Sequence, residues 1–293
     1  MVKAVLRVAV NGWLALTLAF IVLRVLPGDA IRAQLTEAGL SATAIDQRRS
    51  ELGLDLPLGE QYLRYICEIA RGEFGVSLYT GEAVLDVIRG RAGSTLQLAA
   101  YGFVVMLALT VVLANGAARA DWIGSFAQTV ITLAVGLPSY LTGTLLILAI
   151  GLANPEDFRG VLAASFILGF HAGGAVAQVL AVSIAQTRRQ PYITAAHGRG
   201  LRSASIERRH VWPNAILPVL PLAAVQTGFL LSGTVITELV FARPGLGRLM
   251  LDAVQRRDLP IVQSLVLLAA LIYSICLLTA MFTARLIDPR PTS

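Results

Sequence analysis

The stretch YITAAHGRGLRSASIERRHVWPNAILP, residues 192–218, lies between two long hydrophobic runs. Its charges indicate how the chain is oriented across a membrane. The wider loop 186–213 holds a single acid, Glu207, against six arginines: Arg188, Arg189, Arg199, Arg202, Arg208 and Arg209. Arginine and lysine accumulate in the cytoplasmic loops of membrane proteins. We therefore expect this loop to be cytoplasmic and to connect two membrane-spanning helices.

The composition points to a bilayer. Of the 293 residues, 56% are hydrophobic and 14% are charged, and the mean hydropathy is +0.70. Such a chain has too little polar surface to cover itself in water, so membrane lipid is an expected contact. The net charge of +6 is explained by membrane topology. Without an accompanying nucleic-acid motif, it does not predict nucleic acid as a partner.

Six stretches have the ~20 apolar residues that a helix needs to cross a bilayer. They are residues 5–26, 94–118, 125–152, 160–185, 214–240 and 259–287. The prediction is an all-α membrane protein with a first transmembrane helix (1–26), an insert (27–93) and a core of five transmembrane helices (94–293). Both termini are then cytoplasmic and the insert is extracytoplasmic. Four arginines in the loop after the fifth span, which must then lie outside, oppose this orientation: Arg243, Arg248, Arg256 and Arg257.

The insert carries helical periodicity in two places. Leu58, Tyr62, Tyr65, Ile66, Ile69 and Ala70 recur at helical spacing, as do Val84, Val87 and Ile88. We expect short amphipathic helices that are separated at RGEFGVSLYTG, residues 71–81.

The loop 186–213 resembles the coupling segment of ABC-importer permeases. That pattern has a triplet (here Thr194-Ala195-Ala196), a glycine after three residues (Gly200) and a closing apolar element with proline (NAILP, 214–218). More narrowly, the chain is similar to the dipeptide, oligopeptide and nickel branch. The further matching segments are RVLPGDA (24–30), LGLDLPLGEQYLRY (52–65), GEFGVSLYTGEAVLDVI (72–88), ELVFARPGLGRLMLDAVQRRDLPIVQ (238–263) and LIDPR (286–290).

The resemblance implies a permease subunit of an ATP-driven importer in a bacterial inner membrane, with di- or oligopeptides as cargo or, alternatively, nickel or metallophore complexes. It implies three partners: a homologous second permease, cytoplasmic ATPase subunits and an extracytoplasmic substrate-binding protein. The chain lacks the GxxxxGK[ST] phosphate loop, so ATP and Mg are expected on the ATPase subunits. The subunit itself is expected to be non-catalytic and to need no cofactor or metal.

The resemblance also places a short cytoplasmic coupling helix between the fourth and fifth spans. The expected ATPase-coupling residues are Tyr192, Thr194, Ala195, Ala196, Gly198, Arg199, Gly200 and Leu201. Small side chains permit close approach between elements, and glycines permit a sharp turn. Pro213 and Pro218 should interrupt helical bonding where the fifth span begins. The alternative interpretation is a charged loop that only sets orientation.

Polar side chains within the spans are candidates for the translocation pathway because they are costly in lipid. They are Gln97, Gln128, Ser139, Tyr140, His171, Gln178 and Gln226, with Gln263 near them. Hydrogen bonding between helices is the alternative for each one. His171 has no partner residues at metal-ligand spacing. Pro138 should kink the third span, and HAGGA (171–175) should allow close packing. Glu238 and Asp288 are interpreted as interface or capping residues.

Two other classes of protein fit less well. A secondary transporter driven by an ion gradient would need inverted repeats and buried acidic ion sites, and the span centres contain no Asp or Glu. An intramembrane enzyme would need a nucleophile with a base, and no pattern joins Ser139 to His171.

Overall fold

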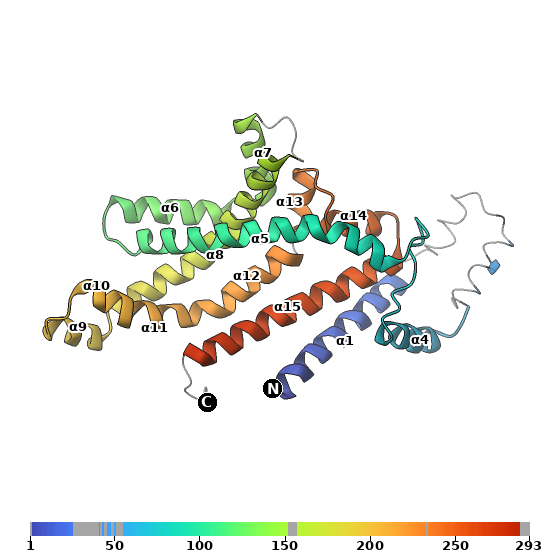
Figure 1. Cartoon of the computed structure of the whole chain (residues 1–293), viewed down its shortest axis with the longest axis horizontal. Coiled ribbons are helices and arrows are strands. Elements are labelled where there is room, and N and C mark those ends of the chain that lie inside the picture. Colours follow the sequence, from blue (N-terminus) through green and yellow to red (C-terminus); the bar gives the residue numbers. More distant parts are fainter. Residues whose placement is uncertain are drawn as a thin grey trace. The chain divides into compact units, whose positions relative to one another are not determined.

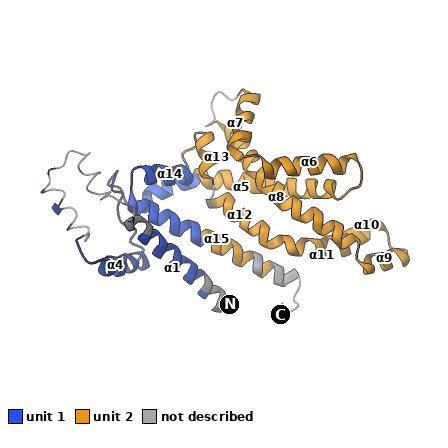
Figure 2. Cartoon of the chain, turned by 180° about the vertical axis from the view of Figure 1, so that it is seen from behind, with its two compact units in different colours: residues 1–93, 245–271 blue, residues 94–244, 272–293 orange. Residues whose placement is uncertain are grey.

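A computed structural model describes residues 2–25, 41, 43, 46, 47, 50, 55–151, 157–232 and 234–287. This described part is almost wholly helical (Figure 1), with an isolated β-bridge between Val76 and Ala83. The chain divides into two compact units (Figure 2). Unit 1 comprises residues 1–93 and 245–271, and unit 2 comprises residues 94–244 and 272–293.

The predicted all-α membrane fold is confirmed. Four stretches of the described chain are long and apolar enough to cross a bilayer: α5 (Val84–Ala117), α8 (Phe158–Arg188), the series Ser203–Val240, and Leu259–Thr279 within α15 (Leu259–Ile287). The bent pair α6 (Trp122–Gly136) and α7 (Ser139–Ile150) makes a fifth if it is one span. The sixth expected span corresponds to α1 (Val2–Val25), whose apolar part is shorter, Val10–Ile21.

The prediction of a separate short helix around Val84, Val87 and Ile88 is wrong. These residues form the first turns of α5, which continues through residue 93 without a break. The sequence RGRAGS (89–94) is polar enough to resemble a loop, yet nothing in it stops a helix. Asp86 in the first turn suits the positive end of the helix dipole and pairs with Arg89 at 3.5 Å.

The predicted helix in the insert is confirmed as α4 (Leu58–Ala70), which begins after Pro57. In unit 1 it packs on α1: the Tyr62 hydroxyl lies 2.7 Å from the Thr17 hydroxyl, and the Phe20 ring centroid lies 5.3 Å from that of Tyr62. Tyr65 stacks on the same phenylalanine. Burial there raises the pKa of the Tyr65 hydroxyl well above its ordinary value.

Helix α8 lies in the core of unit 2 and uses glycine to approach its neighbours. A methyl group at Gly169 would come within 2.6 Å of the Gly102 carbonyl oxygen on α5. A methyl group at Gly174 would come within 2.4 Å of the Ala134 Cβ on α6. The expectation that HAGGA (171–175) permits close packing is therefore confirmed. Without these glycines the helix backbones could not approach so closely.

Gly169→Ala is expected to destabilise the chain by about 1–3 kcal/mol, because the methyl group must displace backbone atoms of α5. The measurement is thermal unfolding of the purified protein in detergent. Gly136→Ala is the matched control, since a methyl group there meets nothing within 4 Å. Equal melting temperatures for the two variants would contradict this packing.

Candidate coupling site

The coupling segment, residues 192–209, is built on a short helix with a glycine exit. Helix α9 (Pro191–Gly198) has proline in its first turn, where its missing N–H is not needed. At its end, Gly200 has φ +74°, and the Leu201 N–H donates to the Ala196 carbonyl at 3.3 Å. Glycine is the usual residue at such a left-handed helix end. The predicted turn is thus confirmed at Gly200, whereas Gly198 is the last residue of α9 and makes no such turn.

The coupling segment has one face buried in its own unit. Ile193 and Ala196 of α9 are 3% and 8% exposed. They belong to a core cluster with Ile206 of α10 (Ser203–Ile206) and with Leu180 and Ile184 of α8. Helix α9 is therefore packed onto the membrane core and does not hang from it as a free loop.

The opposite face is open to solvent. Seven of the eight predicted coupling residues are exposed: Tyr192, Thr194, Ala195, Gly198, Arg199, Gly200 and Leu201. A methyl group at Gly200 would meet nothing within 4 Å, so crowding within the chain does not explain the glycine. Its left-handed backbone conformation does. Ala196 is the exception, because it contacts the core of its own unit.

Helical bonding is irregular from the end of the coupling segment onward, around both predicted prolines. Residues Glu207–Val211 form a π-helical turn, in which the Trp212 N–H donates to the Glu207 carbonyl. Pro213 follows in α11 (Trp212–Ile216), and Pro218 lies in a 3₁₀ turn, Leu217–Val219. Proline cannot donate the backbone bond that an α-helix needs, so the ladder shifts its register. The predicted interruption is confirmed.

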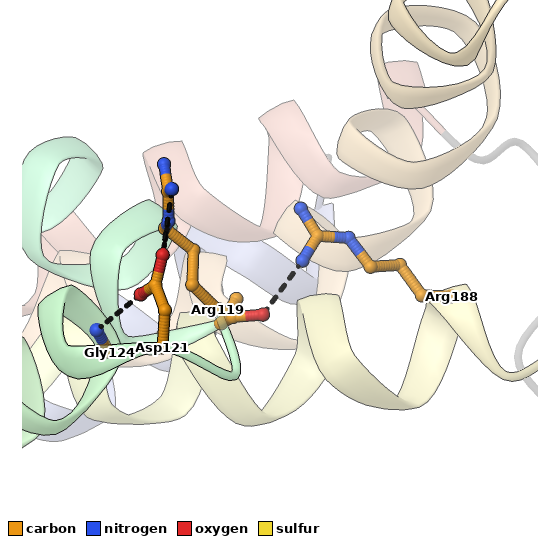
Figure 3. A network of polar contacts seen from close by, with 5 residues as sticks. Arg119, Asp121, Gly124 and Arg188 are labelled. Atoms are coloured by element: carbon orange, nitrogen blue, oxygen red, sulfur yellow. Dashed lines mark hydrogen bonds and ion pairs between the residues drawn. The ribbon is translucent and has the colours of Figure 1, made fainter.

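Arg188, at the end of α8, joins three segments of unit 2. Its Nε donates to the Glu207 Oε1 at 2.8 Å. Its Nη1 donates to the Ala118 carbonyl at 2.9 Å (Figure 3). Its side chain is 34% exposed, so solvent screens only part of the interaction. Arg188 thereby connects the coupling segment to α8 and to the loop after α5. From the sequence alone, Arg188 could not be distinguished from the other five arginines of the loop 186–213.

The loop between α5 and α6, whose Ala118 carbonyl accepts from Arg188, is itself stabilised by hydrogen bonds. The Asp121 carboxylate accepts from the Gly124 N–H at 3.0 Å, which caps the start of α6, and from the Arg119 Nε at 2.9 Å (Figure 3). The bond from Arg119 holds the pKa of the Asp121 carboxyl below its usual value, and the Gly124 N–H adds to this. Gly124 is required, because a methyl group there would lie within 2.1 Å of the Arg119 carbonyl oxygen.

The candidate pathway residues are spread over several helices of unit 2. Gln97 lies on α5, Gln128 on α6, Ser139 and Tyr140 on α7, His171 and Gln178 on α8, and Gln226 on α12 (Leu220–Ser232). Gln97, Gln128, Tyr140 and Gln178 are exposed in this chain. Their role in the pathway stays a prediction. Across the part of the chain that is described, no three His, Cys, Asp or Glu residues form a metal-binding group.

His171 spans the predicted kink at Pro138. Helices α6 and α7 are bent by 112° there, so the kink is confirmed. Because proline has no N–H, the buried Ala134 carbonyl four residues earlier lacks its helical donor. His171 Nδ1 lies 2.6 Å from that oxygen, and its Nε2 lies 2.7 Å from the Thr142 Oγ1 in the first turn of α7. This geometry makes Nδ1 the donor to Ala134 and supports the helix-to-helix interpretation.

His171→Gln is expected to destabilise unit 2 more than His171→Asn. The Asn amide N–H occupies the place of Nδ1 and keeps the bond to the Ala134 carbonyl, whereas the longer Gln amide reaches Thr142 and leaves that buried oxygen without a donor. An unsatisfied buried carbonyl costs about 1–3 kcal/mol. Thermal unfolding of the two variants measures the difference. The reverse order would show that the Thr142 contact is the more important one.

Glu238 joins two helices of unit 2 and is fully buried. Its Oε1 accepts at 2.6 Å from the Thr95 hydroxyl on α5 and at 2.6 Å from the Thr234 hydroxyl. Glu238 itself lies on α13 (Val235–Val240), so the interpretation as an interface residue is supported. Arg243 was not predicted here, yet its Nη2 donates at 3.2 Å to the Gln97 Oε1. Asp288 lies outside the described residues.

The class of protein follows from the similarity of this chain to a known family. The family described as "Binding-protein-dependent transport system inner membrane component" matches residues 106–293, which is more than half of the chain. The chain belongs to this family of ABC-importer permease subunits, which are non-catalytic, multi-pass inner-membrane components. The resemblance seen in the sequence is therefore confirmed.

Individual relatives agree over nearly the whole length. The glutathione transport system permease protein GsiC of Escherichia coli is 28% identical over 279 residues, covering 92% of this chain and 91% of the relative. The protein of the same name in Salmonella paratyphi A is 30% identical over 263 residues, covering 87% and 86%. A crystal structure titled as an amino acid ABC transporter with histidines aligns at a TM-score of 0.54 with 20% identity, covering 71% of this chain and 95% of that one. This last likeness shows the fold alone.

Proposed function

We propose that the chain forms part of the translocation pathway for short peptides or peptide-like cargo, and that ATP-driven work enters it through the coupling segment. The observation that carries the proposal is the two-sided geometry of α9. Ile193 and Ala196 are embedded in the core that holds α8, while Tyr192, Thr194 and Ala195 are exposed. A partner that pushes on the exposed face therefore moves the membrane helices.

The ATPase subunits of the complex bind ATP and Mg, and their closure displaces residues 192–209. Arg188 carries the displacement to the loop after α5 because it bonds both Glu207 and the Ala118 carbonyl. Unit 2 then shifts between two arrangements, which open the pathway alternately to the two sides. In this scheme, both termini and the loop 186–213 are cytoplasmic, and a homologous second permease supplies the other wall of the pathway.

Peptide-like cargo is supported by the relatives, whose name assigns them to glutathione transport. Glutathione is a tripeptide with a free ammonium group and free carboxylates. A binding protein delivers such cargo at the extracytoplasmic face, where the insert 27–93 offers it a surface.

Reconstitution into liposomes tests this function. The complex of both permeases, the ATPases and the binding protein should accumulate labelled glutathione or a dipeptide only when ATP is present on the ATPase side. Accumulation by this chain alone, or accumulation driven by an ion gradient without ATPase, would refute the proposal. Competition with unlabelled peptides and with a nickel chelate separates the two classes of cargo.

A further inference from the structure

Unit 1 contains a preformed cavity of 360 Å³ that the proposed function does not use. Its walls come from two segments that lie far apart in the sequence: residues 77–91, in the insert and the start of α5, and residues 249–261, in α14 (Leu246–Gln255) and the start of α15. In the proposed topology both segments are extracytoplasmic. The volume is at the small end of the range for small-molecule sites.

The two walls are held together by a buried carboxylate. Asp258, which is 2% exposed, accepts from the Ser77 hydroxyl at 2.5 Å and from the Leu78 N–H at 3.1 Å. The Ser77 Oγ in turn accepts from the Tyr79 and Thr80 N–H groups at 3.2 and 3.0 Å. These bonds fix the loop that forms the rim, so the cavity does not have to be ordered by a ligand.

Part of the cavity wall is apolar. Leu249, Ala253 and Ile261 line the cavity and belong to one buried apolar cluster that also contains Val84. On the rim, the Arg256 guanidinium lies 3.9 Å from the Tyr79 ring centroid, which keeps a cation and an aromatic ring at the opening.

Two partly buried charges of opposite sign line this cavity. Asp252 and Arg91 are both partly buried, and neither has a hydrogen-bond or ion-pair partner among the residues that the structure describes. The other lining carboxylates differ: Asp258 is fully engaged, Asp86 is an exposed partner of Arg89, and Glu82 is exposed to solvent. An unpaired charge away from bulk water is costly. A ligand that supplies both counter-charges removes this cost at two places.

We propose that the cavity binds the zwitterionic end groups of a short peptide, with Asp252 accepting from its ammonium group and Arg91 donating to its carboxylate. Guanidinium suits a carboxylate because it can donate two parallel hydrogen bonds. The apolar part of the wall accommodates the side chain. The choice of a peptide rests on the proposed function, whereas the requirement for a zwitterion follows from the cavity itself. The site provides the permease with its own point of cargo contact on unit 1, apart from the binding protein.

Protection of a thiol from labelling tests the site on the permease–ATPase complex without its binding protein. Thr80→Cys places a thiol on the cavity wall, and the native Cys67, which is exposed on α4, is the internal control. Cys276→Ala removes the remaining native thiol. Alanyl-alanine at ten times its dissociation constant should slow maleimide labelling of the introduced thiol about tenfold by mass action, and labelling of Cys67 not at all.

Protection should disappear with N-acetyl and with C-amide forms of the dipeptide, and with Asp252→Asn or Arg91→Gln. Alanine as a free amino acid tests whether a single residue suffices, and the proposal requires that it protects less than the dipeptide. Glu82→Cys gives a second reporter on the same lining if Thr80→Cys does not fold. Protection that survives both charge substitutions, or no protection at either reporter, would overturn the proposal. If ATP-driven uptake by the complete complex persists in that case, the importer function stands and only this site is lost.

Discussion

Gly200→Val should reduce ATP-driven uptake by about tenfold to a hundredfold while the complex still assembles and hydrolyses ATP. Gly200 has φ +74°, a conformation that costs a residue with a side chain about 1–3 kcal/mol. If that cost falls on the coupled arrangement, the coupled population decreases by the corresponding factor. The core is spared because a methyl group at this position meets nothing within 4 Å. The measurement is the ratio of cargo taken up to ATP hydrolysed in proteoliposomes.

A graded series makes this prediction specific to backbone conformation. Gly200→Asn should be the mildest change because asparagine tolerates the left-handed region, Gly200→Ala should be intermediate, and Gly200→Val the most severe. Gly198→Ala is the matched control, since Gly198 is helical and its surroundings are equally open. An uptake ratio that falls equally for both alanine variants would mean that side-chain volume at the exposed surface matters, and the left-handed turn does not.

Arg188→Met should lower uptake by about tenfold and leave hydrolysis by the assembled complex nearly unchanged. The substitution removes the bonds to Glu207 and to the Ala118 carbonyl, and bonds from charged donors contribute about 1.5–3 kcal/mol each. Arg188→Lys should rescue only in part, because an ammonium group lacks the planar fork that donates in two directions. Glu207→Gln keeps an acceptor oxygen and should be milder than Arg188→Met.

Arg64→Met is the control for this second prediction. Arg64 donates to Glu68 at 2.7 Å, a distance similar to that of the Arg188–Glu207 pair, but both residues lie on α4. Uptake should be unchanged in this variant. If Arg188→Met behaved like Arg64→Met, or if it simply prevented assembly, Arg188 would not be a positioning residue for coupling.

Much of the fold could be predicted because hydrophobic length and helix-breaking residues are local properties. The runs around α5, α8 and α15 are too apolar to be anything but buried or lipid-facing helices, and Pro138, Pro213 and Pro218 interrupt helical bonding wherever they stand. The start of α5 at Val84 was missed for the same local reason. Residues 89–94 are polar, and a polar stretch continues a helix when neither proline nor a turn stops it.

The coupling helix could be predicted, whereas the contacts that make it useful could not. Small residues and Gly200 at the expected spacing marked α9, but the sequence contains no sign that Ala196 faces inward while Ala195 faces outward. Arg188 donates to Glu207, nineteen positions later in the sequence. It also donates to the Ala118 backbone carbonyl, a contact that no pattern of side chains predicts. The same holds for Asp258, which bonds Ser77 across 181 positions. Such pairs depend on tertiary packing.

The central claim is that a separate ATPase acts on the exposed face of the coupling segment. A photo-crosslinking amino acid at Ala195 in the assembled complex tests it most directly, with the same probe at Cys67 on α4 as the reference position. We predict an adduct with the ATPase subunit from position 195 whose yield changes when ATP is added, and no such adduct from position 67. An ATPase adduct from position 67, or none from position 195 in a complex that transports, would contradict the account.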